Sequence, residues 1–448
     1  MKSKITLPGA FNLDENPELI VFVGAGGKSS LMIALAGSLS GRVLITTTTR
    51  MFDAQIESAA ASLPGTICRY PDLSSLDIEN GMSKTFLVAG PLSDDKVSGV
   101  PLDLPALLLA RADIDTVLVE ADGAKMLPVK APAAHEPAMP MKATLVVPVL
   151  GIDSLGEQIQ NVAHRAVLVA RLLGKTVADR LTQEDLAMLL AHHDGGLKSV
   201  PINARVIPAI NKVETPEQLT AARQIAHLAL QQPRFQQIVI SQALSDGPVI
   251  EVHKRVTAVI LAAGQSKRMG RSKQQLSWGE TTILGQTIRN LQESAVHDNL
   301  VVTGYEAAAI EAIAAAEGVP TVTNARYAEG EMLSSLQTAV TQLSQNIAAV
   351  LVMMADQPMV ETGTINSLLE AYWQGMGDII APVYGGRRGN PVLIDRRHFS
   401  EILALPAGAA PRDLLQRHEV YLVPVQSKSV LQDIDRLEDY QQYRPSGS

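Results

Sequence analysis

Short apolar runs rich in β-branched residues alternate with longer helical stretches along the whole chain. This alternation is typical of α/β domains, in which helices separate the strands and cover the sheet. The runs that we expect to form strands span residues 19–23, 42–46, 116–120, 205–210, 237–240, 257–261, 299–303 and 349–353.

The order of strand, glycine-containing loop and helix opens the chain and begins afresh near residue 256. Before that point, a turn at residues 246–248 and a charged stretch at residues 251–255 indicate the end of one domain. We therefore expect two α/β domains, residues 1–253 and 254–448. The glycine loops of the two halves differ in spacing, so the halves are not an internal repeat.

Composition narrows the class of protein. The 448 residues are 46% hydrophobic and 19% charged, so the chain can bury substantial cores. The formal net charge of −8 argues against a general nucleic-acid binder. The single cysteine, Cys68, excludes an intrachain disulfide and any multi-cysteine metal site. No apolar run approaches the ~18 residues of a membrane helix, so we expect a cytoplasmic protein with no nucleic-acid or membrane partner.

The loop after residues 257–261 combines small residues with cations. Small residues let backbone N–H groups approach an anion, Gly264 permits the turn, and Ser266 offers a hydroxyl. This combination favours a triphosphate, although an ordinary glycine turn before a solvated basic helix is the alternative. The spacing fits neither a full P-loop nor a dinucleotide fingerprint. The four cations are Lys267, Arg268, Arg271 and Lys273.

Two carboxylates later in the chain are candidate metal ligands. Asp356 follows the apolar run 350–354, so we expect it at the carboxyl end of a buried strand, where α/β sheets bind ligands. A helix N-cap or an Asx turn explains Asp356 equally well, and Asp435 could be a turn residue. Mg²⁺ needs only one or two carboxylates when substrate phosphates supply other ligands.

The segment Leu261–Lys273 resembles the signature L-A-A-G-x-S-x-R-M-G-x-x-K of the MobA-like nucleotidyltransferase superfamily, and most closely the molybdenum cofactor cytidylyltransferases. The resemblance implies a Rossmann-like α/β domain in which Asp356 and Asp435 hold Mg²⁺ over the triphosphate. It also implies a nucleotide-binding set of Leu261, Ala262, Ala263, Gly264, Ser266, Arg268 and Lys273. Further matched blocks are Thr303–Glu306, Asn324, Met332–Leu336, Ala355–Pro358, Arg388–Pro391, Asp433–Asp435 and Glu438–Tyr440.

The reaction that this resemblance implies is transfer of CMP from CTP to the terminal phosphate of molybdopterin, with release of pyrophosphate. A phosphate monoester is largely anionic at pH 7, so no general base is required. Catalysis would consist of positioning and charge neutralisation by Mg²⁺, Arg268 and Lys273, with Asp356 holding the metal.

Nucleotide and acceptor choice stay open at this stage. Guanylyl-transferring relatives tend to have glycine where this chain has Ala263, whose methyl group either narrows the base pocket toward a pyrimidine or only packs a tight turn. Asn390 is a candidate contact to the pterin or a plain turn residue. Residues 405–412 lack an acid that the family often has, and residues 329–335 contain one residue more than usual. The alternatives are another phosphorylated acceptor, the use of GTP, or a non-catalytic cofactor carrier.

In the first half, the apolar run 19–23 is followed by the residues of a shortened P-loop. Its backbone amides would cradle phosphates, Lys28 would reach them, and Ser29 would ligate Mg²⁺. A glycine turn with a solvated lysine is the alternative, because Phe22 stands where the full motif has its first glycine. The expected phosphate-binding residues are Gly24, Gly26, Gly27, Lys28, Ser29 and Ser30.

Two later segments fit the same site. Glu120 and Asp122 end a strand as in a Walker B element, which makes Asp122 a candidate metal ligand, unless both are turn residues. Asn211 and Lys212 resemble the guanine-reading Asn-Lys-x-Asp element with Glu214 in place of the aspartate, although an ordinary loop is as consistent. The first half is therefore expected to bind ATP or GTP.

This half resembles the YqeC family, described as selenium-dependent hydroxylase accessory proteins, over roughly residues 5–250. Lys125, Lys130, His135 and Glu136 form a polar cluster that either binds an anionic ligand or pins a loop. The two resemblances imply successive steps of molybdenum cofactor maturation, in which the first half uses nucleotide binding to hand over, remodel or gate the cofactor for an apo molybdenum hydroxylase. The matched blocks are Gly24–Ser30, Thr46–Met51, Glu120–Lys125, Lys130–Pro137, His164 and Arg165.

Overall fold

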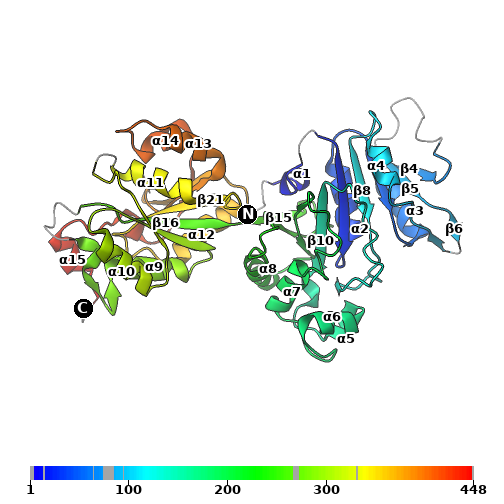
Figure 1. The fold of residues 1–448 in the computed structure, drawn as a ribbon, viewed down its shortest axis with the longest axis horizontal. Helices are drawn as coiled ribbons and strands as arrows, with labels where there is room; N and C mark the ends of the chain where they lie inside the picture. The colour runs from blue at the N-terminus through cyan, green and yellow to red at the C-terminus, as the bar shows by residue number, and fades with distance from the viewer. Residues whose placement is uncertain are drawn as a thin grey trace. The chain divides into compact units, whose positions relative to one another are not determined.

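The computed structural model describes residues 5–13, 16–63, 65–73, 85–93, 95–265, 272–328 and 331–445. The chain folds into two compact units, Met1–His253 and Lys254–Ser448, whose elements are labelled in Figure 1. Within the described residues, no helix is both long and apolar enough to span a bilayer.

The N-terminal unit is built on a sheet with the order β15-β14-β13-β10-β1-β8-β2-β5-β4, and β12 also pairs with β10. The central strand β1 lies parallel to both of its neighbours, β10 and β8. The strands are β1 (Glu18–Gly24), β2 (Val43–Thr47), β4 (Thr66–Arg69), β5 (Thr85–Ala89), β8 (Thr116–Glu120), β10 (Leu145–Gly151), β12 (Arg205–Val206), β13 (Ala209–Asn211), β14 (Gln237–Ser241) and β15 (Val249–Lys254).

Alternate residues of β1 enter two different cores, which is why the whole strand is apolar. Ile20 and Phe22 pack with residues of α2, whereas Leu19, Val21 and Val23 pack with residues of α4. The helices of this unit are α1 (Leu7–Ala10), α2 (Lys28–Ser38), α3 (Asp53–Ser62), α4 (Leu104–Leu109), α5 (Ile159–Val162), α6 (Ala166–Leu173), α7 (Gln183–Ala191) and α8 (Pro216–Ala229). Short strands form two small sheets: β3 (Met51–Phe52) with β6 (Leu92–Ser93) and β7 (Lys96–Val97), and β9 (Val129–Lys130) with β11 (Ala163–His164).

The C-terminal unit has an eight-stranded sheet with the order β20-β19-β16-β21-β24-β22-β23, and β25 also pairs with β22. Strand β16 lies parallel to β19 and β21, whereas β24 runs antiparallel to β21 and to β22. The strands are β16 (Val256–Leu261), β19 (Asp298–Thr303), β20 (Thr321–Thr323), β21 (Ala349–Met354), β22 (Ile379–Tyr384), β23 (Arg387–Arg388), β24 (Val392–Asp395) and β25 (Tyr421–Pro424).

Both faces of this sheet are again apolar. Ile260 of β16 packs in one core with residues of α9 and α12, whereas Val259 and Leu261 pack in the other with residues of α11. The helices are α9 (Ile283–Gln292), α10 (Ala307–Ala316), α11 (Glu331–Gln342), α12 (Thr362–Trp373), α13 (Phe399–Ala404), α14 (Pro411–Arg417) and α15 (Leu437–Tyr443). A hairpin of β17 (Ser277–Trp278) and β18 (Thr281–Thr282) precedes α9.

The expected α/β fold class is confirmed for both halves. The expected strands coincide, to within one residue at each end, with β1, β2, β8, β14, β16, β19 and β21. The expected strand at residues 205–210 is wrong in one respect, because Ile207 and Pro208 separate β12 from β13. Proline has no N–H group to donate to a neighbouring strand, so the ladder is interrupted where it stands.

Candidate functional site

The loop after β16 begins at the centre of the C-terminal sheet, between β19 and β21. Ala262 N donates to Val302 O at 3.0 Å, and Tyr305 N donates to Ala263 O at 3.2 Å, so the start of the loop is fixed against β19 and the residues after it. Ala262 and Ala263 are buried, whereas Gly264 is exposed. The predicted ligands Ser266 and Arg268 lie outside the described residues.

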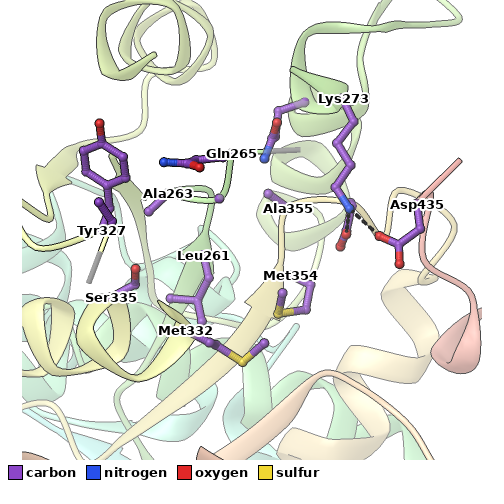
Figure 2. A pocket seen from close by; sticks show the side chains of 14 residues that line it. Leu261, Ala263, Gln265, Lys273, Tyr327, Met332, Ser335, Met354, Ala355 and Asp435 are labelled. Carbon is purple, nitrogen blue, oxygen red and sulfur yellow. Dashed lines mark hydrogen bonds and ion pairs between the residues drawn. The ribbon is translucent and has the colours of Figure 1, made fainter. Parts of the chain in front are cut away.

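Lys273 joins two carboxylates that come from distant parts of the chain. It opens the 3-10 turn η3 (Lys273–Gln275), and its Nζ donates to Asp356 Oδ2, at the end of β21, and to Asp435 Oδ1 at 2.7 Å. Figure 2 shows the ammonium of Lys273 reaching toward the carboxylate of Asp435. All three side chains line one cavity of about 490 Å³. The structure thus brings together three of the predicted site residues.

The neighbouring charges in this site shift the pKa values of Lys273 and Asp433. Burial alone would lower the pKa of Lys273, but the negative charge of Asp356 and the hydrogen bonds to Asp356 and Asp435 outweigh burial and raise that pKa. The lysine is therefore an ammonium ion at neutral pH. Burial raises the pKa of Asp433, and the charge of Asp356 raises it further.

Backbone and amide contacts fix the segment that bears Asp435. Ile434 N donates to Asp356 O at 3.0 Å. Gln357 Nε2 donates to Asp433 Oδ1 at 2.6 Å. The segment before α15 is therefore held at the end of β21, which keeps the two carboxylates on either side of Lys273.

The carboxylates fit a divalent metal ion. Asp356 Oδ1 is buried and, among the described residues, makes no hydrogen bond, while its other oxygen accepts from Lys273. The Asp435 side chain is 40% exposed, so it can also reach a ligand in the cavity. Hard cations such as Mg²⁺ prefer oxygen ligands and take substrate phosphates and water for the remainder. Asp356 and Asp435 are the residues that would hold such an ion.

The rest of the cavity wall is mainly apolar. Leu261 and Met354 come from the two central strands, and Met332 comes from α11 (Figure 2). Gly304 lies directly behind this wall: a Cβ atom there would come within 2.8 Å of Ala263 Cβ and 2.7 Å of Tyr327 Cβ. Only glycine permits this close approach. An apolar wall beside a charged group suits a nucleotide, whose base is flat and whose phosphates are anionic.

Tyr327 and Ser335 also line the cavity. Sequence reasoning missed Tyr327, and it included Ser335 in a matched block without assigning it a role. Asn324 is buried, and its amide donates to the hydroxyls of Ser334 and Ser335 at 2.8 and 3.1 Å, so it positions Ser335. The matched blocks at Asn324 and Met332–Leu336 could have identified this group. Asn390 is not among the described residues that line the cavity, and its N–H donates to Val430 O at 2.9 Å.

In the N-terminal unit, β1 ends in a glycine loop that leads into α2. Gly24, Gly26 and Gly27 have φ angles of 93°, 78° and 103°, the left-handed region that favours glycine. Space is also restricted, because a Cβ on Gly24 would lie 2.4 Å from Val149 O and one on Gly26 would lie 2.0 Å from Gly151 N. Ser30 lies in the first turn of α2.

The lysine of this loop is buried rather than solvated. Lys28 is 4% exposed, and its Nζ donates to Gly24 O at 2.7 Å and lies 3.1 Å from Asp122 Oδ1. Ser29 Oγ donates to Glu120 Oε2 at 2.6 Å. Glu120 ends β8, the parallel neighbour of β1, and Asp122 follows it, so both side chains reach the loop. The structure thus joins the predicted Walker B-like acids to the predicted phosphate loop.

A chain of alternating charges continues from Asp122. Lys130 Nζ lies 3.1 Å from Asp122 Oδ2 and 2.8 Å from Glu136 Oε2, and Arg165 NH1 lies 2.6 Å from the same Glu136 oxygen. We call Lys28, Asp122, Lys130, Glu136 and Arg165 the charge chain. Of the predicted polar cluster, Lys130 and Glu136 belong to it.

The other two members of the predicted cluster, Lys125 and His135, are exposed. The cavity beside Gly24, Asp122 and Lys130 is only about 30 Å³, roughly the room of one water molecule. In the described conformation, Lys130 and Glu136 pin the loop at residues 130–136.

Asn211 holds the glycine loop in place through a hydrogen bond to its backbone. Its amide is buried, donates to Gly26 O at 3.0 Å, and accepts from Ser241 Oγ and Ala243 N at 3.1 Å each. Lys212 Nζ pairs with Asp153 Oδ2 at 2.8 Å. The structure therefore gives Asn211 a bracing role, and guanine reading by Asn211 and Lys212 stays a prediction.

Two family models match this chain, one in each unit. The model described as "YqeC protein" matches residues 20–167, and the model described as "MobA-like NTP transferase domain" matches residues 258–421. "Uncharacterized protein YqeC" of Escherichia coli (strain K12) is 35% identical over 235 residues, which cover 50% of this chain and 89% of that protein. The chain belongs to the YqeC family. Its N-terminal unit is the YqeC domain.

The C-terminal unit is a MobA-like NTP transferase domain, and the chain is a nucleotidyltransferase. Molybdenum cofactor cytidylyltransferase of Escherichia coli (strain K12) is 28% identical over 187 residues, which cover 41% of this chain and 93% of that protein. Nicotine blue oxidoreductase of Paenarthrobacter nicotinovorans is 28% identical over 200 residues, which cover 42% of this chain and 95% of that protein.

The charge chain of the YqeC domain makes stability depend on pH. Burial alone would raise the pKa of Glu136. The hydrogen bonds from Arg165 and Lys130 and the charges of these residues outweigh burial, and they lower this pKa from 4.5 to about 2. A carboxyl group whose pKa is lower in the folded state stabilises the fold above its unfolded pKa, and this contribution disappears as the pH falls through the folded pKa. The stabilisation by Glu136 is therefore complete above about pH 5 and declines toward pH 2.

Glu136→Gln removes this charge and leaves Lys130 and Arg165 without their shared partner. We expect it to lower the free energy of unfolding of the YqeC domain by about 3 kcal/mol at neutral pH, because it breaks a largely buried ion pair. The loss should shrink as the pH falls from about 5 toward 3. Urea unfolding followed by circular dichroism measures both effects, with the exposed Glu214→Gln as control. A loss equal to that of the control, or one independent of pH, would contradict this account.

Proposed function

We propose that the MobA-like domain transfers CMP from CTP to the terminal phosphate of molybdopterin and releases pyrophosphate. The observation that supports this most is the group of Lys273, Asp356 and Asp435 at the carboxyl ends of the central strands, beside a cavity with an apolar wall. The domain is similar to a molybdenum cofactor cytidylyltransferase along nearly the whole length of that protein. This similarity supports CTP and molybdopterin as the proposed substrates.

The charges of the site explain why a metal is needed. Lys273 supplies one positive charge against the two negative charges of Asp356 and Asp435, so the group by itself would repel a triphosphate. Mg²⁺ held by the two carboxylates would supply the missing positive charge and act as a Lewis acid on the phosphates. Lys273 is then released to contact the phosphates.

The chain's own groups position the reactants. The backbone N–H groups of residues 263–265 would face the phosphates, and Lys273 would neutralise charge that builds up as pyrophosphate leaves. The acceptor phosphate attacks the α-phosphorus of CTP, a P–O bond to it forms, and the bond to pyrophosphate breaks. Because the acceptor is already anionic at pH 7, no side chain has to remove a proton. Arg268, in the same loop, would add a second positive charge.

We propose CTP rather than GTP as the nucleotide. Ala263 lines the cavity and packs against Gly304, where there is no room for a Cβ atom. The methyl group of Ala263 is the feature that would narrow the base pocket toward a pyrimidine. Asn390 remains a proposed contact to the pterin rather than to the nucleotide.

Pyrophosphate release by the full chain with molybdopterin and Mg²⁺ tests this proposal. We expect turnover with CTP and not with GTP, and a fall in kcat of about 10²- to 10³-fold in Asp356→Asn, because one metal ligand and its charge are lost. Glu293→Gln, an acid-to-amide change at the exposed residue that directly follows α9, should leave kcat unchanged.

Other results of the pyrophosphate assay would point to a different function. Turnover that prefers GTP, or that occurs only with another phosphorylated acceptor, would show a different nucleotidyltransferase. Binding of molybdopterin with no turnover for either nucleotide would show a cofactor carrier and would contradict the proposal.

For the YqeC domain we propose nucleoside triphosphate binding at residues 24–30, coupled to delivery of the cofactor to an apo molybdenum hydroxylase. The support is the glycine loop with its left-handed residues, together with Lys28, Ser29 and Asp122 gathered at one strand end. Phosphates would take Lys28 from Asp122, and Asp122 would keep Lys130 as its partner. Ser29 and Asp122 are the proposed metal ligands, and either ATP or GTP is a candidate nucleotide.

Lys28→Met tests the N-terminal proposal without touching the other site. We expect about a tenfold or greater loss of ATP or GTP affinity, because a charge-assisted contact to phosphate is lost. Reconstitution of an apo-hydroxylase should fall in parallel, while pyrophosphate release stays unchanged. The exposed Lys125→Met serves as control. Unchanged nucleotide affinity or unchanged delivery in Lys28→Met would refute the proposal.

A further inference from the structure

A second group of metal-ligating side chains lies in the MobA-like domain, outside the nucleotide cavity. His398 ends the 3-10 turn η4 (Arg396–His398), Glu401 lies in the first turn of α13, and His418 directly follows α14. One ligand atom of each residue lies within 4.8 Å of the other two. Residues 396–418 are all described, so the structure places all three side chains of this group.

The strand register places this group at the opposite end of the sheet from the nucleotide. Asp356 follows the carboxyl end of β21, whereas β24 runs antiparallel and pairs Asp395 with Ala349 at the amino end of β21. The turn that bears His398 starts directly after Asp395. Six residues of strand span about 20 Å, so an ion bound there would not touch the reacting phosphates.

The side chains already face one another. His418 Nε2 lies 2.6 Å from Glu401 Oε2, and the rings of His398 and His418 are 4.5 Å apart with 62° between their planes. Two imidazoles and one carboxylate form a donor set that Zn²⁺ and similar transition metals prefer. If these residues formed only an ion pair between His418 and Glu401, the ring of His398 would not be required beside them.

A cavity of about 200 Å³ adjoins the group and is lined by both histidines, Asp378 and Tyr421. It offers room for water as a further ligand of a bound ion, as in three-ligand zinc sites. Two arginines face the carboxylates: Arg417 NH1 lies 3.3 Å from Glu401 Oε1, and Arg397 NH1 lies 2.6 Å from Asp378 Oδ2. The other carboxylate oxygen, Glu401 Oε2, faces His418.

We propose that His398, Glu401 and His418 bind one transition-metal ion of the Zn²⁺ class. Such an ion would join the end of β24, α13 and α14. The other histidine-rich group, His192, His193 and Asp194, consists of consecutive residues on the surface of the YqeC domain, and the His193 side chain is 82% exposed. It provides a matched control with the same number of imidazoles.

Zn²⁺ titration of the metal-stripped full chain, in competition with a chromogenic chelator, tests this proposal. We expect one tight equivalent whose dissociation constant rises about tenfold or more in His418→Ala and in Glu401→Gln, because each change removes a ligand. Co²⁺ should give the visible absorption of a low-coordinate site in the wild-type chain and lose it in both variants. The double variant His192→Ala, His193→Ala should retain the tight equivalent and the Co²⁺ spectrum.

Circular dichroism in chelator establishes that each variant is folded, and the nearly isosteric Glu401→Gln keeps the test valid if His418→Ala does not fold. The proposal is overturned if the wild-type chain has no equivalent tighter than about 100 μM. It is also overturned if the tight equivalent survives in Glu401→Gln or disappears in the His192→Ala, His193→Ala variant.

Discussion

The C-terminal site depends on one ammonium ion held between two carboxylates. Lys273, Asp356 and Asp435 come from three segments of the chain, and their ion pairs offset the cost of burying Lys273 and Asp356. In the proposed function, a triphosphate alone would meet the net negative charge of this group, and a metal ion alone would have to compete with the ammonium of Lys273 for the carboxylates. Nucleotide and metal binding are therefore coupled in this account.

The YqeC domain uses the same principle at its own strand ends. Lys28 pairs with Glu120, the last residue of β8, and with Asp122 just after it, and these acids reach the loop because β1 and β8 are parallel neighbours. Asp356 likewise follows β21, the parallel neighbour of β16, whose own loop leads to Lys273. In both domains a lysine and an acid meet where adjacent parallel strands end, which is where such sheets bind ligands. In the described structure, the lysine of each domain is paired with acids of the protein.

Much of this arrangement could be predicted from the sequence because it follows local rules. Continuous apolar runs identified the buried strands, and residues directly after them were expected at the ligand-binding edge. The break at Pro208 was missed, because the apolar pattern continues through it. The charge chain could be predicted only in part: Lys130 and Glu136 were singled out, but their ion pairs with Asp122 and Arg165 depend on packing between distant segments.

Other features of the site follow only from three-dimensional packing. The bracing role of Asn211 and the close approach of Gly304 to Ala263 and Tyr327 join segments that are far apart in sequence. Tyr327 has no local pattern that marks it as a cavity residue. The predicted ligands Ser266 and Arg268 lie outside the described residues, so their roles rest on the sequence alone.

The affinity for Mn²⁺, a spectroscopic substitute for Mg²⁺, would show whether Lys273 competes with a metal ion for the two carboxylates. Electron paramagnetic resonance of the full chain, with and without CTP, measures free and bound Mn²⁺ for the wild type and for Lys273→Met. The account predicts weak binding to the wild type without CTP, much tighter binding with it, and tighter binding to Lys273→Met without CTP, because the two carboxylates lose their internal cation. Equal affinity in the wild type with and without CTP, together with no change in Lys273→Met, would contradict it.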